Sequence, residues 1–305
     1  MIDAKAIKEK ALSLGAQVVG IGDIRAFDGV SPQRDPKMIL PGAKCVLGFG
    51  FAVPRGLYFG MEKGTQYYGY TTLGVKYIDE EMAEIFLLKM GAFIENEGYD
   101  ACLQKSIPNL RITGDKTTNP EVADTYELIH AEAVEHGKPA PDVMIDFALA
   151  AKACGIGSLG LNGRILNPQY GPFMRYCFII TDLPLKADLP LREPICDRCG
   201  DCIAACDGHA VSEKGLDTWQ CAVYYKGAHE SNPLMTDEFL KDDPERAAIL
   251  NGEKRFDAAS ARKIFPQMDF LPRTQWGYAP CLCGAKCAVA CFKHLKKEGR
   301  IGHEK

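Results

Sequence analysis

The chain has 305 residues, of which 47% are apolar, and a formal net charge of −4. This length predicts about two domains, and the apolar content is enough for packed cores. The negative charge gives no general attraction to a polyphosphate, so the composition does not favour a nucleic-acid partner. No stretch is long and apolar enough to span a membrane, and the first residues show neither a signal-peptide pattern nor a twin arginine. We therefore expect a cytoplasmic protein without a membrane span.

The first part of the chain alternates predicted helices and strands. Apolar side chains at helical spacing predict a helix over 4–14, and apolar runs at 17–24 and 43–53 predict strands. A longer amphipathic pattern predicts a helix over 77–94. Residues 103–142 are polar, contain scattered prolines and have no strong period, so we expect a long excursion across the surface.

Two segments around these elements have unusual composition. The stretch TQYYGYTTLG at 65–74 contains Tyr68 and Tyr70, which either pack on the core or face a bound cofactor and donate a proton. Farther along, the block at 155–171 contains a GxGxxG pattern. A dinucleotide fingerprint follows a strand and opens a helix, but here an alanine-rich helical run comes first. We therefore expect a loop in which backbone approaches a strand or a flat ligand, followed by a strand over 175–183.

Cysteine is the most informative residue type in this chain. There are 13 cysteines, and cysteine clusters in a reducing compartment usually bind metal or carry out redox chemistry. The run CDRCGDCIAACDGHA at 196–210 has the spacing C-x2-C-x2-C-x3-C, in which three thiolates hold one [4Fe-4S] cluster and the fourth reaches a second cluster. The stretch PCLCGAKCAVACFKH at 280–294 supplies a partner motif, and Cys221 stands between the two.

This spacing predicts two [4Fe-4S] clusters. The ligands expected for the first are Cys196, Cys199, Cys202 and Cys291, and those for the second are Cys206, Cys221, Cys283 and Cys287. Cys281 is an alternative to Cys283. Zinc is the alternative metal, but its sites usually have paired C-x2-C knuckles, which leave the third cysteine of the first run without a role. The isolated cysteines are expected to pack in the core as small apolar side chains: Cys45, Cys102, Cys154 and Cys177.

The order of these motifs resembles that of epoxyqueuosine reductases and reductive dehalogenases. The similar features are LGAQVVGIG at 14–22, GIGSLGLNGRILNPQYGPFMRYCFIITDLPL at 155–185, both cysteine motifs and the isolated WQC that ends at Cys221. The resemblance implies an α+β fold with a nitroreductase-like core over 1–188 that binds base-off cobalamin. A ferredoxin-like domain with two [4Fe-4S] clusters and an inserted helical segment would follow over 189–305.

The resemblance also implies site residues and partners. The residues expected to bind cobalamin are Gly155, Gly157, Gly160, Asn162, Gly163, Tyr170 and Arg175. The candidate proton donors are Tyr68, Tyr70 and an acid before the glycine block, Asp142, whereas surface or helix-capping roles are the alternative for Asp142 and Asp146. Electrons would come from an external donor of the ferredoxin or flavodoxin type and reach cobalt through the clusters. The reaction would remove a leaving group from a small-molecule substrate.

Two other functions fit the same residues. A protein with the same clusters but no corrinoid would transfer electrons to a partner, such as a corrinoid protein that needs reactivation. Alternatively, a nitroreductase-like core would hold a flavin. All three functions need the cysteine clusters, so the cofactor of the first domain distinguishes them.

Overall fold

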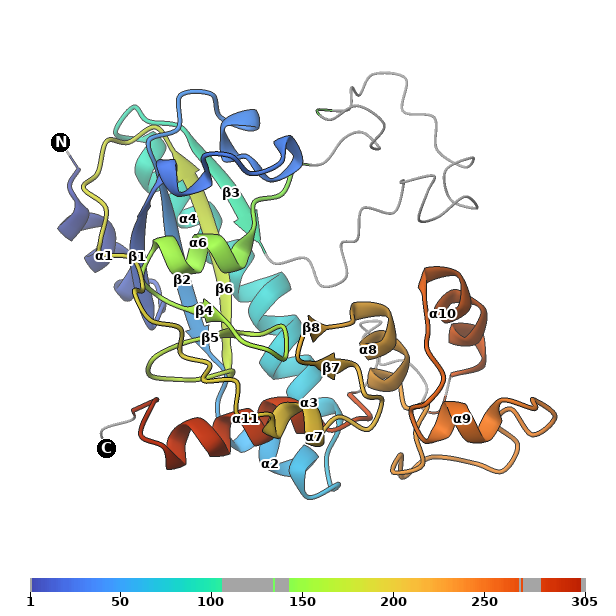
Figure 1. Cartoon of the computed structure of the whole chain (residues 1–305). Coiled ribbons are helices and arrows are strands. Elements are labelled where there is room, and N and C mark those ends of the chain that lie inside the picture. The colour runs from blue at the N-terminus through green and yellow to red at the C-terminus, as the bar shows by residue number, and fades with distance from the viewer. Residues whose placement is uncertain (1, 106–133, 135–142, 269, 271–280, 303–305) are drawn as a thin grey trace. The chain divides into compact units, whose positions relative to one another are not determined.

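The computed structural model describes residues 2–105, 134, 143–268, 270 and 281–302 (Figure 1). The chain forms two compact units. Unit 1 contains Met1–Ala52, Ile78–Ser158 and Met174–Glu193, and unit 2 contains Val53–Tyr77, Leu159–Phe173 and Pro194–Lys305. The division expected at residue 188 lies near the last of these boundaries, but two earlier segments also belong to unit 2. No helix of the described part is long and apolar enough to cross a membrane.

Unit 1 is built on a four-stranded antiparallel sheet with the order β1-β2-β6-β3 (Figure 1). Strands β1 (Val18–Asp23), β2 (Cys45–Ala52) and β6 (Met174–Thr181) confirm the three predicted strands. Strand β3 (Ala101–Lys105) is a correction, because it overlaps the start of the segment expected to be an excursion. Apart from residue 134, the remainder of that segment, 106–142, lies outside the described residues.

Helices of unit 1 cover both faces of this sheet. Their bounds are α1 (Ala4–Ser13), α4 (Ala83–Glu95) and α6 (Phe147–Ala153), with short 3-10 turns η1 (Ile24–Phe27), η2 (Pro32–Arg34) and η3 (Pro36–Met38). The helix predicted over 77–94 is present, but it begins as a π-helix, η4 (Thr72–Met82), before it continues as α4. Aspartates start two of the helices, because Asp3 caps α1 and Asp146 caps α6.

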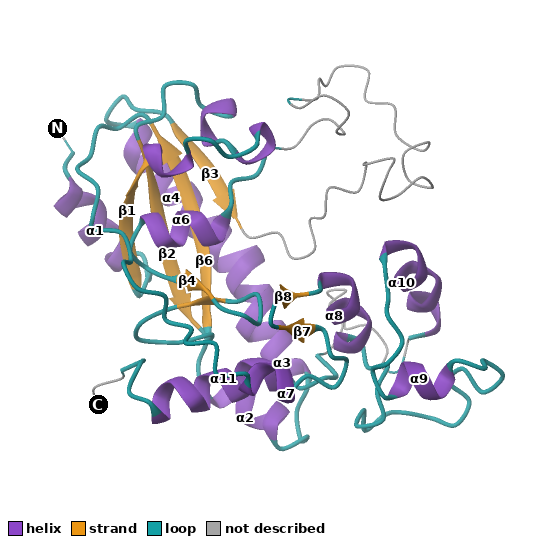
Figure 2. Ribbon diagram, viewed as in Figure 1, coloured by secondary structure: helices purple, strands orange, loops and turns teal. Residues whose placement is uncertain are grey.

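Alternating glycine and phenylalanine in β2 explain how the helices fit on the sheet. The sequence CVLGFGFA directs the two residue types to opposite faces. Phe49 lies edge-on to Phe86 of α4, with ring centroids 4.9 Å apart. On the other face, a Cβ atom on Gly48 would lie 2.8 Å from the Ile156 side chain. Glycine there lets the segment that follows α6 approach the sheet closely, while α4 covers the opposite face (Figure 2).

Unit 2 consists of short helices and short β-ribbons. The helices are α2 (Gly56–Glu62), α3 (Tyr68–Thr71), α7 (Asp201–Ala204), α8 (Thr218–Tyr225), α9 (Arg246–Leu250), α10 (Ala258–Ile264), η5 (Phe265–Gln267) and α11 (Lys286–Lys297). The ribbons pair β4 (Ser158–Leu159) with β5 (Ile165–Leu166) and β7 (Val211–Ser212) with β8 (Gly215–Leu216).

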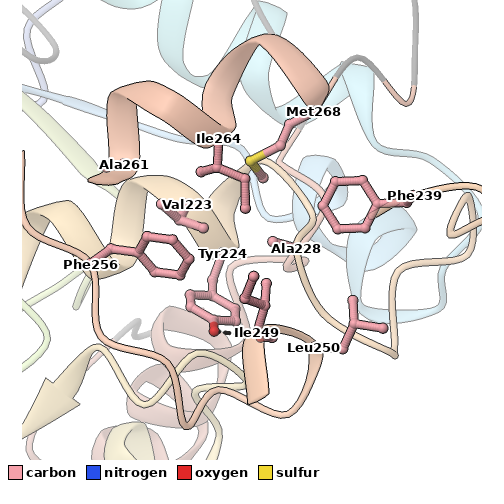
Figure 3. Close-up of a cluster of buried hydrophobic side chains, with 10 residues drawn as sticks. All are labelled: Val223, Tyr224, Ala228, Phe239, Ile249, Leu250, Phe256, Ala261, Ile264 and Met268. Carbon is pink, nitrogen blue, oxygen red and sulfur yellow. Dashed lines mark hydrogen bonds between the residues drawn. The ribbon is translucent and has the colours of Figure 1, made fainter. Parts of the chain in front are cut away.

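A separate apolar core holds the helices that lie between the two cysteine motifs in sequence. Figure 3 shows buried side chains from α8, α9 and α10 packed around Tyr224. The Tyr224 hydroxyl donates a hydrogen bond of 2.5 Å to the Ile249 carbonyl oxygen, which satisfies the polar end of this buried ring. Gln220 is fully buried beside this core. Its side-chain amide donates hydrogen bonds to the carbonyl oxygens of Gly208 and Lys254 and accepts one from the backbone N–H of Phe256. The segment therefore has its own packing and does not depend on the cysteines alone.

Candidate metal centre

Four cysteines of unit 2 line one pocket. We call Cys196, Cys199, Cys202 and Cys291 the first thiol group; Leu161, Asn162 and His294 also line the pocket. The first three cysteines flank or belong to α7, and Cys291 lies on α11, which packs against α7 (Figure 2). The structure therefore brings together the four residues expected at the first cluster.

Tight backbone turns make this arrangement possible. Arg198 and Gly200 have φ values of 61° and 87°, which are in the left-handed region. Because these residues alternate with the cysteines, the chain curls around the pocket instead of running straight past it. The Arg198 guanidinium fixes the turn by donating a hydrogen bond of 2.5 Å to the Glu213 carbonyl oxygen.

A second set of thiols gathers in the same unit. We call Cys206, Cys221, Cys283 and Cys287 the second thiol group, since the other three all interact electrostatically with Cys221. Burial, together with repulsion from these neighbouring thiols, raises the pKa of Cys221 to about 12. Burial likewise raises the pKa of Cys287 to about 11. Thiols gathered in this way gain from a cationic metal centre that stabilises the thiolates.

The spacing of the thiols favours a cluster over a single zinc ion. Tetrahedral zinc with sulfur ligands at about 2.3 Å brings the sulfurs within roughly 3.8 Å of one another. Among the described residues, the only three potential ligand atoms that all lie within 4.8 Å belong to Asp197, Cys199 and His294. No three thiols of either group meet this criterion among the described residues, and a [4Fe-4S] cluster, which is several atoms across, does not require them to.

Cys281 and Cys283 lie next to each other in the structure. Their sulfur atoms are 3.7 Å apart, and Cys281 is fully buried whereas Cys283 is half-buried. Cys283 is the strongest electrostatic neighbour of Cys221. The geometry therefore favours Cys283 as the fourth member of the second thiol group.

The isolated cysteines all lie in unit 1. Cys45, Cys154 and Cys177 are at most 2% exposed and belong to the core, as expected. Cys102 is a correction, because it is only half-buried on β3, an edge strand with every residue partly exposed.

A buried polar loop contacts the second thiol group. Asn162 is 3% exposed, and its amide donates a hydrogen bond of 3.5 Å to the Cys287 carbonyl oxygen. Arg164, which the sequence patterns did not identify, donates through Nη1 to the Tyr70 hydroxyl at 2.9 Å. Burial acts to lower the pKa of the Arg164 guanidinium, but Tyr70 and Cys287 outweigh it, so this pKa is raised and the group stays charged. The only available signal was a charged residue inside an otherwise apolar, glycine-rich block.

The glycines expected to bind cobalamin have close contacts within the chain itself. Gly155 has a φ of 71°, and a Cβ atom there would lie 2.5 Å from the Leu189 carbonyl oxygen. Gly163 has a φ of 75°, and a Cβ atom there would lie 2.5 Å from the Leu216 side chain. These packing demands account for glycine at both positions without a ligand. Gly157 is buried and donates a backbone hydrogen bond to Ala151, as part of the turn that ends α6.

The other expected cofactor residues are divided between the units. Gly160 and Tyr170 belong to unit 2, where Gly160 packs against Leu166 and Tyr170 is half-buried. Arg175 belongs to unit 1 and forms a two-pronged ion pair with Asp79, with a distance of 2.9 Å from Nε to Oδ1. Burial raises the pKa of Asp79, and Arg175 offsets part of this effect.

The candidate proton donors occupy different environments. Tyr70 is 1% exposed and accepts the hydrogen bond from Arg164, whereas Tyr68, on the same short helix α3, is half-buried. Asp146 accepts hydrogen bonds of 2.9 and 3.0 Å from the first turn of α6, which confirms the helix-capping alternative for this residue. Asp142 lies outside the described residues.

The fold and the two thiol groups together define a mixed α+β protein with a cysteine-rich unit, and comparisons with known proteins agree. No protein-family model matches the chain. It is 38% identical over 74 residues to the epoxyqueuosine reductase of Leadbetterella byssophila, which is 24% of each chain. A longer match to the epoxyqueuosine reductase of Lactococcus garvieae is 24% identical over 208 residues and covers 67% of this chain and 48% of that protein.

The fold comparison leads to the same group of proteins. A solved reductive dehalogenase, reported with a mechanism for B12-dependent dehalogenation, aligns over 97% of this chain and 37% of its own, with 15% identity and a TM-score of 0.51. Solved epoxyqueuosine reductases give TM-scores of 0.44 to 0.47. The sequence matches confirm the expected resemblance, and the dehalogenase match at a TM-score of 0.51 agrees with the α+β fold class. The chain spans from about a quarter to about half the length of these two curated relatives.

Proposed function

We propose that this protein is an iron-sulfur oxidoreductase that depends on cobalamin and removes a leaving group from its substrate by reduction. One observation carries most of the proposal: unit 2 gathers two groups of four cysteines, drawn from motifs that are far apart in sequence. The cysteines expected at each cluster from the sequence are the members of the two thiol groups. The likeness to epoxyqueuosine reductases in sequence and to a reductive dehalogenase in fold supports the same class of reaction.

The first thiol group holds one [4Fe-4S] cluster and the second thiol group holds the other. Each cluster takes ligands from both cysteine motifs, because Cys291 completes the first group and Cys206 belongs to the second. The apolar side chains of Leu161 and Val211 pack among four of these cysteines, Cys196, Cys202, Cys206 and Cys287. The clusters receive single electrons from an external ferredoxin or flavodoxin type donor.

Cobalamin, when bound, would supply a reducible cobalt centre for this reduction. The residues proposed to contact it lie in the block at 155–171, with Arg175 on β6: Gly155, Gly157, Gly160, Asn162, Gly163, Tyr170 and Arg175. Tyr68, Tyr70 and Asp142 are the proposed sources of the proton that the departing group takes up. Of these, Tyr70 has its phenol oxygen positioned by the hydrogen bond from Arg164.

The proposed substrate is a small molecule, and the proposed location is the cytoplasm. The chain has 13 cysteines, all with free thiols, and such thiols persist in a reducing compartment. The alternative substrate is a nucleic acid, because one solved epoxyqueuosine reductase contains a tRNA-Tyr epoxyqueuosine-modified tRNA stem loop. The net charge of −4 favours the small molecule.

Metal analysis and EPR of anaerobically reconstituted protein test this function. We expect about eight iron and eight sulfide per chain, as two clusters require. Added cob(II)alamin should bind in its base-off form, and the reduced protein should then act on a halogenated aromatic compound but not on a modified tRNA stem loop. About four iron, or stoichiometric zinc without iron, would contradict the two-cluster assignment. Full iron without cobalamin binding would favour the electron-transfer protein, and a bound flavin would favour the third function.

A further inference from the structure

One charged side chain beside the second thiol group has a role that goes beyond holding the Tyr70 hydroxyl. Arg164 lies in the loop between β4 and β5, and its side chain is half-buried. We propose that Arg164, held in place by Tyr70, is a fixed cation that raises the reduction potential of the second [4Fe-4S] cluster. The inference rests on the proposed function, because it requires the second thiol group to hold a cluster.

The guanidinium of Arg164 is held by a fully buried partner. Its Nη1 donates to the Tyr70 hydroxyl at 2.9 Å, and its central carbon lies 6.0 Å from the centroid of the Tyr70 ring. Tyr70 is 1% exposed, so the ring has little freedom to move. Tyr70 therefore acts as a positioning residue for the cation.

The backbone of Arg164 is tied to the second thiol group as well. Its amide donates a hydrogen bond of 3.2 Å to Asn162 Oδ1, and its carbonyl oxygen accepts one of 2.7 Å from Gly160. The same Asn162 side chain donates to the Cys287 carbonyl oxygen at 3.5 Å. The backbone of Arg164 is thus linked through Asn162 to α11, on which Cys287 lies, while its side chain is held by Tyr70.

The charge of Arg164 acts on the thiols of the second group. The Arg164 guanidinium interacts electrostatically with Cys287 and Cys221. A fixed positive charge at this place favours negative charge on the cluster that these thiols would hold.

Among the described residues, no carboxylate is paired with Arg164. The partner of its guanidinium is the Tyr70 hydroxyl. The other cation near the second group, Lys286, is paired with Asp207 at 2.7 Å. Arg164 is therefore a cation beside this thiol group that no described carboxylate pairs with.

Coulomb's law gives the direction of the effect. A [4Fe-4S] cluster with four thiolate ligands gains one more negative charge when it is reduced. A fixed cation therefore stabilises the reduced form more than the oxidised form, and the apolar packing of Leu161, Val211 and Leu216 among the cysteines limits screening by water. Loss of the cation should lower the midpoint potential of this cluster alone.

An EPR-monitored redox titration of the anaerobic protein tests the inference. In Arg164→Gln, we expect the ratio of reduced to oxidised cluster at a fixed potential to fall at least tenfold, which is about 59 mV for a one-electron couple. The affected signal should be the one that is lost in Cys221→Ala, and the other midpoint should not change. Arg164→Lys keeps a cation and should recover most of the shift. Tyr70→Phe keeps the cation but frees it, so the shift should be smaller than in Arg164→Gln.

Three results would overturn the inference. The first is an unchanged midpoint potential in Arg164→Gln that retains its iron. The second is a fall of the midpoint potential in Arg164→Lys that equals the fall in Arg164→Gln. The third is a shift confined to the cluster that does not depend on Cys221. If Arg164→Gln loses iron, Tyr70→Phe with full iron decides, and an unchanged midpoint there rejects the role. Wild-type protein without two clusters would instead reject the proposed function itself, which iron analysis shows before any titration.

Discussion

The ion pair between Arg175 and Asp79 offers a direct test of how unit 1 is stabilised. The Asp79 side chain is 2% exposed and that of Arg175 is 21% exposed, so Arg175→Gln leaves a carboxylate buried without its partner. Removing one member of a buried ion pair typically costs about 3–5 kcal/mol. Because water still reaches part of Arg175, we expect the lower end, about 3 kcal/mol, which is roughly a hundredfold in the opening equilibrium of the sheet.

Hydrogen-exchange mass spectrometry of β6 (Met174–Thr181) measures this effect where it occurs. In protein prepared without cobalamin, β6 amides should exchange roughly a hundredfold faster in Arg175→Gln than in wild type. Arg175→Lys keeps the charge and should lie between the two. If Arg175 served only to bind the cofactor, exchange in this protein would not change, and the stabilising role would be refuted.

The pH dependence of the same variant gives an independent check. Burial raises the pKa of Asp79 in the folded protein, so the stability that its protonated form contributes is present below its unfolded pKa and is lost as pH rises through the folded pKa. Without Arg175 the folded pKa should rise further. The loss of stability in Arg175→Gln relative to wild type should therefore be greatest at neutral pH. It should shrink as the pH falls toward the ordinary carboxyl range. A deficit that does not depend on pH would contradict this account, and Asp79→Asn in the same background should relieve it at neutral pH.

Three further experiments, with four substitutions, test other parts of the molecule. Cys221→Ala should lower the iron content and disturb the EPR signal of one cluster. The control Cys154→Ala should keep its full iron content and lose only the packing of a small side chain. If both variants keep their full iron content, Cys221 is a core residue and not a ligand. Gly155→Ala should destabilise unit 1 by more than about 1 kcal/mol, because the φ of Gly155 is 71° and the new Cβ would meet the Leu189 carbonyl oxygen. Thermal unfolding followed by circular dichroism measures this loss. An unchanged unfolding curve would refute it. Gln220→Ala should lower the free energy of unfolding by about 3 kcal/mol, because three hydrogen bonds to backbone groups are lost. Urea unfolding followed by tryptophan fluorescence measures this free energy. A change below about 1 kcal/mol would argue against a stabilising role of these hydrogen bonds.

The fold could be predicted from sequence where burial alone determines structure. Strands β2 and β6 are central and nearly fully buried, and the edge strand β1 has three buried residues in its middle; each appears as an apolar run. Strand β3 has no such signal, because it is an edge strand in which every residue is half-buried. The π-helical start of the 77–94 helix was also not predictable, since apolar spacing does not specify the hydrogen-bond register of a helix.

The candidate site could be predicted as far as local spacing specifies it. The cysteine intervals indicated two groups of four, and the structure gathers the same residues. Arg164 was missed because its partner Tyr70 is distant in sequence and only the folded chain brings them together. The composition of Val53–Tyr77 and Leu159–Phe173 likewise gives no sign that both segments pack with the C-terminal residues in unit 2.

The interlaced arrangement of the two thiol groups has a consequence for how unit 2 folds. In the proposed assignment, Cys202 and Cys206 lie only four residues apart but serve different clusters, and Cys287 and Cys291 do the same on α11. Neither cluster can therefore be completed by one motif alone. Because metal binding contributes directly to folding free energy, each cluster also stabilises the packing of α7 on α11 that the other one needs. Cooperative loading of the two clusters follows from this geometry, since the first to form brings the remaining ligands of the second into place.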